Sequence, residues 1–176
     1  MGKKVAVIGA GGIGFDVAEF LAHSGPATSQ NVEAFMAEWG VDMTFSARGG
    51  VEGMEAQTEP ASREIFLLQR TEKKVGAGLG KTTGWIHRTG LKSKGVKMMP
   101  GCSYERIDDA GLHILLNKEP VVLDVDTIVI CAGQTPKRDL AEGLTKPHHL
   151  IGGADVAAEL DAKRAIDQAT RLAAVI

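Results

Sequence analysis

The chain has 176 residues, of which 44% are hydrophobic and 24% are charged, a composition typical of one ordinary globular domain with room for a small appendage. Its formal net charge of -2 offers no basic field to nucleic acid or to an anionic membrane, and no apolar run approaches the roughly 20 residues needed to span a bilayer. Two cysteines, Cys102 and Cys131, are too few for a metal-binding quartet and indicate no disulfide scaffold. We therefore expect a cytoplasmic protein without a metal site.

Strands and helices alternate in the predicted first half of the chain. The unbroken apolar run at residues 4–8 is typical of a parallel strand that is covered on both faces. Residues 40–62 are polar and glycine-rich and show no clear period, which indicates a surface insertion. The elements expected here are a strand over 4–8, a helix over 13–23, a helix capped by Ser29 with Phe35, Met36 and Trp39 at helical spacing, an insertion over about 24–62, and a strand over 64–70.

The second half of the chain adds a meander and a closing helix. Turn residues at 108–111 and 117–120 predict an antiparallel β-meander over 103–125. The other elements expected are a helix from about 83 to 94 with Gly95 at its end, a strand over 96–99, a buried strand over 127–131, a short strand over 149–151, and a helix over 156–176 whose apolar stripe contains Ala162, Ile166, Ala169 and Ala173.

This order of elements predicts an α/β fold. It has a Rossmann-like parallel sheet in which the antiparallel meander replaces a crossover helix. Residues 1–147 are expected to form the Rossmann-like domain, with the insertion at about 24–62. Residues 148–176 are expected to supply a closing strand and helix.

A glycine-rich turn joins the first predicted strand to the first predicted helix. Gly9 makes the tight turn, Gly11 lets the backbone approach a pyrophosphate, and Gly14 lets the helix pack close to the strand. A phosphate there faces free N–H groups at a helix N-terminus, where the helix dipole favours an anion. The strand–turn–helix context favours dinucleotide binding over a packing turn without a ligand. The residues predicted to bind are Gly9, Ala10, Gly11, Gly12, Ile13 and Gly14.

The end of the second predicted strand indicates which dinucleotide is bound. The acidic residue that holds the ribose of NAD is expected about 20 positions after the turn, but that spacing reaches Glu33, inside the insertion. The second strand ends instead in Gln69 and Arg70, and a guanidinium can bind a 2′-phosphate through two hydrogen bonds. This favours NADPH, although an arginine at a strand end is often only solvated. The basic residues that follow and support the phosphate interpretation are Lys73, Lys74, Lys81 and Arg88.

A second candidate site lies where the short strand at 149–151 would meet the closing helix. Gly153 and Asp155 follow that strand, and the Asp155 carboxylate is suited to accept hydrogen bonds from sugar-alcohol hydroxyls. The backbone amides near residues 160–162 are suited to face a developing anion. The alternative is that Asp155 only caps the helix.

Three stretches of the chain are more distinctive than its composition. They are residues 5–16, residues 28–42 (TSQNVEAFMAEWGVD) and residues 78–99, which open with GLGKTTGWIHR. They closely resemble the C-terminal part of bacterial NADPH-dependent 2,4-dienoyl-CoA reductase, a family related to trimethylamine dehydrogenase and to the NADPH domains of disulfide reductases. The resemblance covers nearly the whole chain.

The resemblance implies a flavoprotein in which NADPH reduces FAD. Electrons then pass through a 4Fe–4S cluster to FMN, which reduces a 2,4-dienoyl-CoA in the β-oxidation of unsaturated fatty acids. In that family the FMN, the cluster and the catalytic residues belong to an N-terminal barrel, which is expected to be absent here, together with the first half of the FAD domain. The chain is thus expected to be the NADPH domain plus the closing part of an FAD domain, without catalytic residues and inactive alone.

The resemblance also assigns roles to residues outside the glycine turn. The turn at Ala132, Gly133 and Gln134 would pass near the cofactor, and Arg164 would meet NADPH at the junction of the two domains. The residues implied to touch FAD are Gly153 and Asp155, at its ribityl and pyrophosphate region, and the amides of Leu160, Asp161 and Ala162, at the flavin ring.

Two other functions stay open at this point. The first is a standalone dinucleotide-binding or sensing domain without catalysis. The second is a relative of trimethylamine dehydrogenase whose corresponding site does not use NADPH. A segment suited to FAD without a second glycine fingerprint favours a redox module over a sensor. Arg70 and its basic neighbours count against the second alternative.

Overall fold

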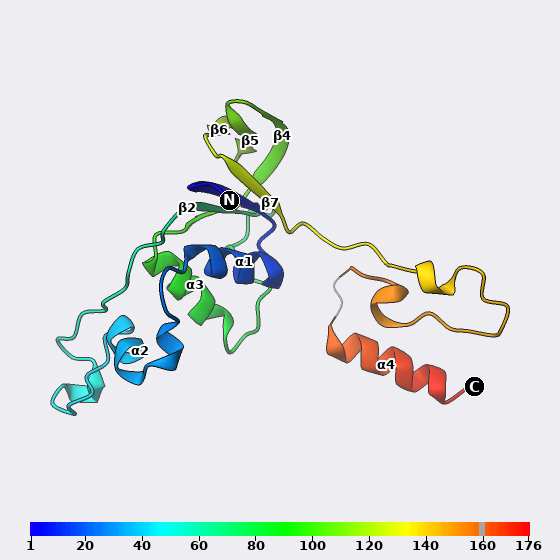
Figure 1. Cartoon of the computed structure of the whole chain (residues 1–176), viewed down its shortest axis with the longest axis horizontal. Coiled ribbons are helices and arrows are strands. Elements are labelled where there is room, and N and C mark those ends of the chain that lie inside the picture. The colour runs from blue at the N-terminus through cyan, green and yellow to red at the C-terminus, as the bar shows by residue number, and fades with distance from the viewer. Residues whose placement is uncertain (159–160) are drawn as a thin grey trace. The chain divides into compact units, whose positions relative to one another are not determined.

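The computed structural model describes residues 1–158 and 161–176. The chain divides into two units, Met1–Ala132 and Gly133–Ile176 (Figure 1). In neither described range is a helix long and apolar enough to cross a membrane. The predicted domain boundary at residue 147 stays a prediction.

A four-stranded parallel sheet forms the centre of the first unit, which confirms the predicted α/β fold. Its strands run in the order β3-β2-β1-β7. The pairing of β1 with β2 extends from Lys4 opposite Glu64 to Ile8 opposite Leu68, so both strands end at the same edge. The strands of this sheet and the helices between them are β1 (Lys4–Ile8), α1 (Gly12–Ala22), β2 (Glu64–Leu68), α3 (Gly84–Ser93), β3 (Lys97–Met99) and β7 (Thr127–Ile130).

The predicted meander forms a separate antiparallel sheet that links β3 to β7. Its strands are β4 (Cys102–Asp108), β5 (Gly111–Leu116) and β6 (Glu119–Leu123), in the order β4-β5-β6. Asn117 and Lys118 join β5 to β6 with φ angles of 51° and 74°, the left-handed pair that a two-residue hairpin turn requires. The meander therefore takes the place of a crossover helix, as predicted.

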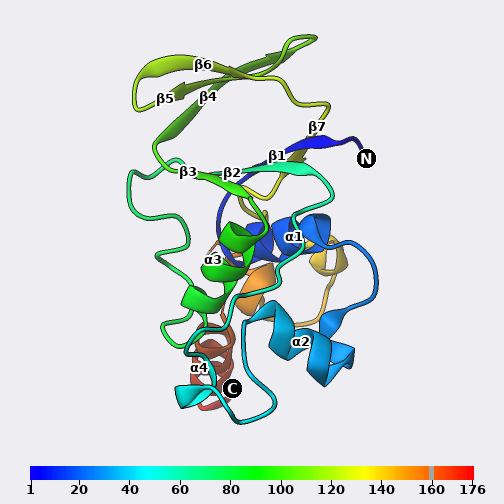
Figure 2. The same ribbon diagram turned by 90° about the vertical axis from the view of Figure 1, so that its left-hand side faces the viewer.

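The two faces of the parallel sheet carry two different hydrophobic clusters. Side chains alternate along a strand, so Val5 and Val7 of β1 pack with the helices, whereas Ala6 and Ile8 pack with the antiparallel sheet. Figure 2 shows the parallel sheet between these two layers. Burial on both faces explains why β1 is an unbroken apolar run.

The prediction of a fully buried strand at 127–131 is wrong in one respect. β7 lies at the edge of the sheet, next to β1 only, and its side chains are half-buried or exposed. Ile130 is 71% exposed. An apolar run identifies a strand but does not reveal whether a neighbour covers it.

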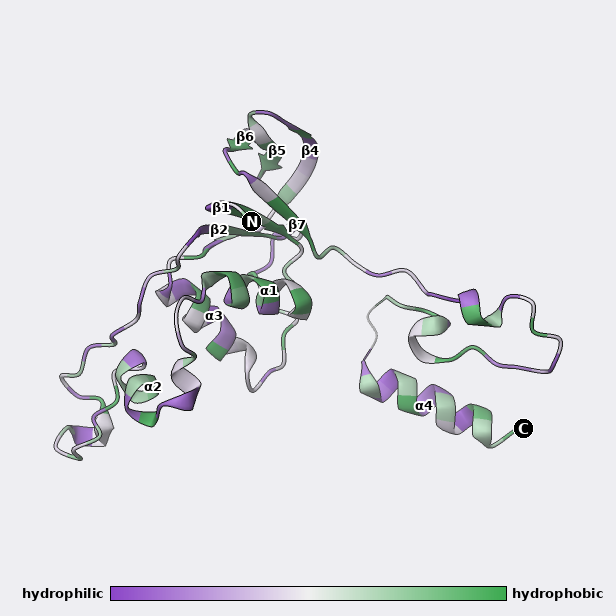
Figure 3. Cartoon of the chain, in the orientation of Figure 1, coloured by the Kyte–Doolittle hydropathy of each residue, from purple (hydrophilic) through white to green (hydrophobic). Residues whose placement is uncertain are grey.

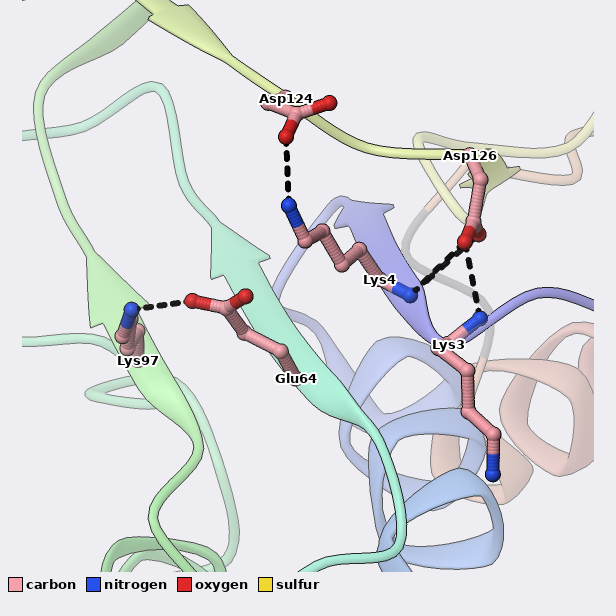
Figure 4. Close-up of polar contacts among 6 residues, drawn as sticks. All are labelled: Lys3, Lys4, Glu64, Lys97, Asp124 and Asp126. Atoms are coloured by element: carbon pink, nitrogen blue, oxygen red, sulfur yellow. Dashed lines mark hydrogen bonds and ion pairs between the residues drawn. The ribbon is translucent and has the colours of Figure 1, made fainter.

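Polar contacts fix the start of β1 to the segment that precedes β7 (Figure 4). The Asp126 carboxylate accepts hydrogen bonds from the backbone N–H groups of Lys3 at 2.9 Å and Lys4 at 3.2 Å. The Lys4 ammonium pairs with Asp124 at 2.5 Å. These contacts lie at the amino end of β1, whereas the glycine turn follows its carboxyl end.

The insertion contains one short α-helix and two 3-10 turns, the second at Arg48–Gly50, and the cap of the α-helix differs from the predicted one. Ser29 lies in a 3-10 turn (Thr28–Gln30), and α2 spans Val32–Glu38. Asn31 is the N-cap, because its side-chain oxygen accepts a hydrogen bond from the backbone N–H of Ala34 at 3.1 Å. Residues 40–62 contain no strand, in agreement with a surface insertion.

The short strand predicted at 149–151 is absent from the second unit. These residues have no regular structure, and a 3-10 turn, Gly152–Ala154, follows them directly. A strand needs a hydrogen-bonding neighbour, and within 133–158 and 161–176 the structure contains no strand to supply one. The earlier 3-10 turn of this unit spans Asp139–Ala141.

The closing helix, α4, spans Ala162–Ala173 and is shorter than predicted. Asp161 caps it, because its carboxylate accepts a hydrogen bond from the backbone N–H of Arg164 at 2.7 Å. The predicted apolar stripe lies on this helix, and Ala162, Ile166 and Ala173 of it are exposed. Figure 3 shows hydrophilic and hydrophobic residues alternating along α4. Its half-buried residues are Arg164, Ala165, Gln168, Ala169 and Leu172.

Candidate functional site

The glycine turn follows β1 at the carboxyl edge of the parallel sheet. The backbone N–H of Gly9 donates to the carbonyl oxygen of Leu68, the last residue of β2, at 3.0 Å. Gly9 has a φ of 106°, and a Cβ placed there would collide with the carbonyl of Cys131. Only glycine therefore fits between the ends of β2 and β7 at this position.

The last glycine of the turn and the two glycines in its middle have opposite steric demands. A Cβ on Gly14 would collide with the carbonyl oxygen of Gly9, so the close approach of α1 to the turn needs glycine there. By contrast, a Cβ on Gly11 or Gly12 would meet no atom within 4 Å. These two glycines leave open space in front of the backbone rather than relieving a clash within the protein.

The first turn of α1 is suited to bind an anion. Gly11 is the N-cap and has no side chain to accept a hydrogen bond, and no acidic residue lies in the first turn. The first N–H groups of a helix have no partner within it, and they carry the positive end of the helix dipole. The open space at Gly11 and Gly12 therefore faces unpaired donors, which is the arrangement that a pyrophosphate requires.

Gln69 and Arg70 follow β2 at the same edge of the sheet. The Gln69 amide donates to the carbonyl oxygens of Thr71 at 3.1 Å and Lys73 at 2.8 Å, so it shapes the segment that follows the strand. Arg70 is exposed and forms no ion pair among the residues that the structure describes. Glu33, at the spacing where NAD-binding units carry an acidic residue, lies in α2.

The basic segment between β2 and α3 is held against α1. Arg88 donates from Nη1 to the carbonyl oxygen of Gly76 at 2.9 Å. Gly76 has a φ of 72°, and a Cβ there would come within 2.6 Å of the Phe15 ring. Lys73, Lys74 and Lys81 are exposed on this segment.

The residues after β7 fall into different units. The Cys131 N–H donates to the carbonyl oxygen of Ile8 at 2.7 Å, and burial raises the pKa of its thiol. Ala132 ends the first unit, beside the glycine turn. Gly133 and Gln134 belong to the second unit and are exposed.

In the second unit, Asp155 is tied to α4 by a residue that the sequence did not single out. Gln168 donates from Nε2 to the Asp155 carboxylate at 2.7 Å, and its Oε1 accepts the N–H of Gly152 at 2.7 Å. Arg138 donates from Nε to the carbonyl oxygen of Ala154 at 2.9 Å. These contacts join residues 13 to 16 positions apart, so no periodicity signals them. Gly153 lies within the turn that they hold.

The other residues assigned to FAD or to the domain junction lie at the start of α4. Leu160 is outside the described residues, while Asp161 and Ala162 form the N-terminus of the helix. The Arg164 guanidinium donates to the carbonyl oxygens of Val156 at 2.6 Å and Ala158 at 3.0 Å, within its own unit. Its contact with NADPH stays a prediction.

The fold and this turn together define a dinucleotide-binding α/β protein. Residues 1–163 match the family model described as pyridine nucleotide-disulphide oxidoreductase, and the chain belongs to that family. The family and its structural neighbours are FAD- and NAD(P)-dependent oxidoreductases. The membership of the narrower 2,4-dienoyl-CoA reductase family stays a prediction.

Solved structures and one curated protein are similar to this chain over part of their own length. The 2-naphthoyl-CoA reductase–2-naphthoyl-CoA complex covers 100% of this chain with 21% of its own, at 19% identity and a TM-score of 0.63. The HOCl-induced flavoprotein disulfide reductase RclA of Escherichia coli matches 77% of this chain with 22% of its own, at 14% identity and a TM-score of 0.45. Nucleotide-binding protein Bd0338 of Bdellovibrio bacteriovorus is 29% identical over 82 residues, 47% of each chain. The chain thus spans about half of this curated relative and about a fifth of the solved reductases.

Proposed function

We propose that this chain is the NADPH-binding module of a flavin-dependent oxidoreductase and that it positions NADPH to reduce FAD. The observation that carries the proposal is the open backbone at Gly11 and Gly12, which faces the unpaired N–H groups of α1 beside the end of β2. When it is bound, NADPH supplies a hydride.

The order of the strands determines the direction in which the bound dinucleotide extends along the carboxyl edge of the sheet. The N–H groups of the first turn of α1 bind the pyrophosphate, and the Arg70 guanidinium binds the 2′-phosphate at the end of β2. Because β1 lies between β2 and β7, the other half of the dinucleotide extends toward the end of β7 and Ala132. Gln69 supports Arg70 by holding the segment after the strand.

The second unit supplies the residues proposed for FAD. One Asp155 carboxylate oxygen accepts the Gln168 amide, and the carboxylate keeps acceptor capacity for the hydroxyls of a sugar alcohol. Asp161 satisfies the N–H of Arg164, which leaves the N–H of Ala162 and its neighbour in the first turn of α4 to face an anion. Gly152 and Gly153 let the backbone turn tightly just before Asp155.

The narrower part of the proposal concerns the whole protein. The stretches at 28–42 and 78–99 support the reduction of a 2,4-dienoyl-CoA by a longer protein, whose FMN and 4Fe–4S cluster would be held outside this chain. The solved structure that covers the full chain is a reductase in complex with a CoA thioester, 2-naphthoyl-CoA, although at 19% identity it supports the fold alone.

Gly11→Val tests the site directly. The Cβ of a valine there meets no atom of the protein within 4 Å, and the side chain occupies the open space in front of the N–H groups. We therefore expect NADPH binding, measured by titration calorimetry, to be lost in a variant with an unchanged circular dichroism spectrum. Unchanged affinity in the folded variant would mean that the turn is only structural.

A further inference from the structure

A groove of about 440 Å³ lies beside β3, at the opposite end of the sheet from β7. Its walls are the segment after β2, one face of α3 and the end of β3. The volume is that of a small-molecule site. The lining residues that matter here are Lys74, Trp85, Arg88, Thr89, Lys92 and Met98.

One stripe of α3 forms the side wall of the groove. Trp85, Arg88 and Lys92 are three and four positions apart, so they lie on the same face of the helix. The other face packs inward. Leu91 is buried in the core, and His87 Nδ1 lies 3.4 Å from Oε2 of Glu19 in α1. The stripe therefore faces the groove rather than the neighbouring helix.

The groove is positively charged without internal compensation. Lys74, Arg88 and Lys92 line it, and no carboxylate does. Arg88 and Lys92 are like charges four positions apart on a helix, an arrangement that is unfavourable by itself. None of the three cations forms an ion pair within residues 1–158 and 161–176. An anion in the groove would remove their repulsion.

The remaining lining residues fit an aromatic group. Trp85 is 54% exposed, and Met98 and Val75 are apolar. Aromatic rings stack on tryptophan, and the Thr89 hydroxyl can donate to or accept from a ligand. The groove thus combines a stacking surface with three cations.

The groove begins at the carboxyl ends of β2 and β3, on the edge where the dinucleotide is proposed to lie, and extends from there along α3. α3 begins at the carboxyl edge of the sheet and has 10 residues, which corresponds to about 15 Å. Lys92 is in its last turn and so lies near the opposite edge. A ligand that reaches Lys92 follows the flank of the helix instead of the edge of the sheet.

We propose that this groove is a second ligand site, separate from the glycine turn, for a nucleoside monophosphate. Its base stacks on Trp85, and its phosphate is bound by Lys74, Arg88 and Lys92. This assigns Lys74 and Arg88 to the groove and leaves the 2′-phosphate of NADPH to Arg70. The proposal goes beyond the proposed function and does not depend on it.

AMP is the probe, and Trp85 is the reporter. The full chain with Trp39→Phe contains Trp85 as its single tryptophan. We expect AMP to quench its fluorescence with one binding site, equally well with and without saturating NADP⁺. Adenosine alone and inorganic phosphate alone are expected to bind more weakly than AMP, because each engages half of the groove. Raising the salt concentration is expected to weaken AMP binding.

Charge removal locates the site. In the same background, the double variant Lys74→Gln/Lys92→Gln is expected to bind AMP about tenfold more weakly or worse. Lys74→Gln and Lys73→Gln each remove one positive charge, but Lys73 does not line the groove, so Lys73→Gln is expected to change affinity less than about twofold and less than Lys74→Gln does.

Three results would overturn the second site. AMP that does not change Trp85 fluorescence overturns it, and so does equal weakening by Lys73→Gln and by the double variant. Displacement of AMP by NADP⁺, together with loss of AMP binding in Gly11→Val, would make the groove part of the dinucleotide site. Each of these leaves the proposed function intact. Failure of NADP⁺ to bind, with AMP still bound in the groove, would instead overturn the proposed function alone.

Discussion

Arg70 is the residue on which the choice of cofactor depends. Its exposed guanidinium follows β2 beside the glycine turn. A charge-assisted pair with the 2′-phosphate contributes about 1.5–3 kcal/mol, and about 1.4 kcal/mol corresponds to a factor of ten. Arg70→Ala is therefore expected to weaken NADPH binding roughly 10- to 100-fold and to leave NADH binding nearly unchanged, because NADH lacks the 2′-phosphate. Titration calorimetry with both nucleotides measures the difference.

Lys73→Ala is the matched control for Arg70. An exposed, flexible ammonium usually contributes less than about 1 kcal/mol, so its loss is expected to have the smaller effect on NADPH. Equal losses of NADPH and NADH affinity in Arg70→Ala would show that Arg70 supports the fold rather than binding the phosphate.

Asp108 makes the β4–β5 hairpin sensitive to acid. Hydrogen bonds from His113 at 2.8 Å and Arg106 at 3.0 Å lower its pKa to about 2. Because the folded pKa lies below the unfolded value of about 3.9, this contribution to stability is full above about pH 4 and is lost as the pH falls toward 2. We expect the urea midpoint of the wild type to exceed that of Asp108→Asn at pH 5, and the gap to narrow toward pH 3. A gap that does not change with pH would exclude this ionisation as its cause.

At the scale of elements, Asp126 joins the start of β1 to β7. Its carboxylate accepts hydrogen bonds from the backbone N–H groups of Lys3 and Lys4. Asp126→Ala leaves these groups without an acceptor from the protein, so we expect a lower urea midpoint with an unchanged slope.

Asp124→Ala provides the comparison for Asp126→Ala. It removes a carboxylate of the same size, which pairs with the exposed Lys4 ammonium. Exposed ion pairs contribute little, so its midpoint is expected to stay close to that of the wild type. Equal shifts in the two variants would contradict a specific role for the backbone contacts.

The elements that could be predicted are those whose signal is local. The apolar run of β1 specifies a parallel strand that is buried on both faces. The turn at Asn117 and Lys118 specifies a hairpin of the antiparallel meander. The strand expected at 149–151 could not be excluded, because three apolar residues look the same with or without a neighbour to pair with. The start of α4 was misplaced because Asp155 and Asp161 are equally good caps in the sequence, and only folding selects Asp161.

The candidate site divides in the same way. The glycine turn is contiguous in the sequence, so each of its glycines could be assigned a role, and the collisions at Gly9 and Gly14 agree with two of those roles. The contacts of Gln168 and Arg138 with the segment around Asp155 join residues that only folding brings together. No spacing rule links such residues, and the same holds for the groove beside β3.

At the scale of the whole molecule, the proposed function makes the chain one part of a longer electron path. We expect the isolated chain to purify colourless and without iron, since it carries one glycine fingerprint and a short segment suited to FAD. With NADPH and added FAD it is expected not to reduce a 2,4-dienoyl-CoA. Absorbance near 450 nm, an iron assay and NADPH consumption measure these expectations. Stoichiometric bound FAD, or turnover of the dienoyl-CoA, would contradict the expectation that this chain lacks a complete FAD site and the catalytic residues.

The pairing of β1 with β7 has a consequence for how the protein is made. Val5 lies opposite Thr127, so one side of β1 stays without its partner until the whole meander has left the ribosome. At about 5–20 residues per second that delay lasts roughly 6–24 s. Parallel pairing between such distant segments is also slow to form, since loop closure precedes any gain in contacts. During synthesis β1 is therefore a hydrophobic strand with an open edge, the kind of segment that chaperones protect from aggregation.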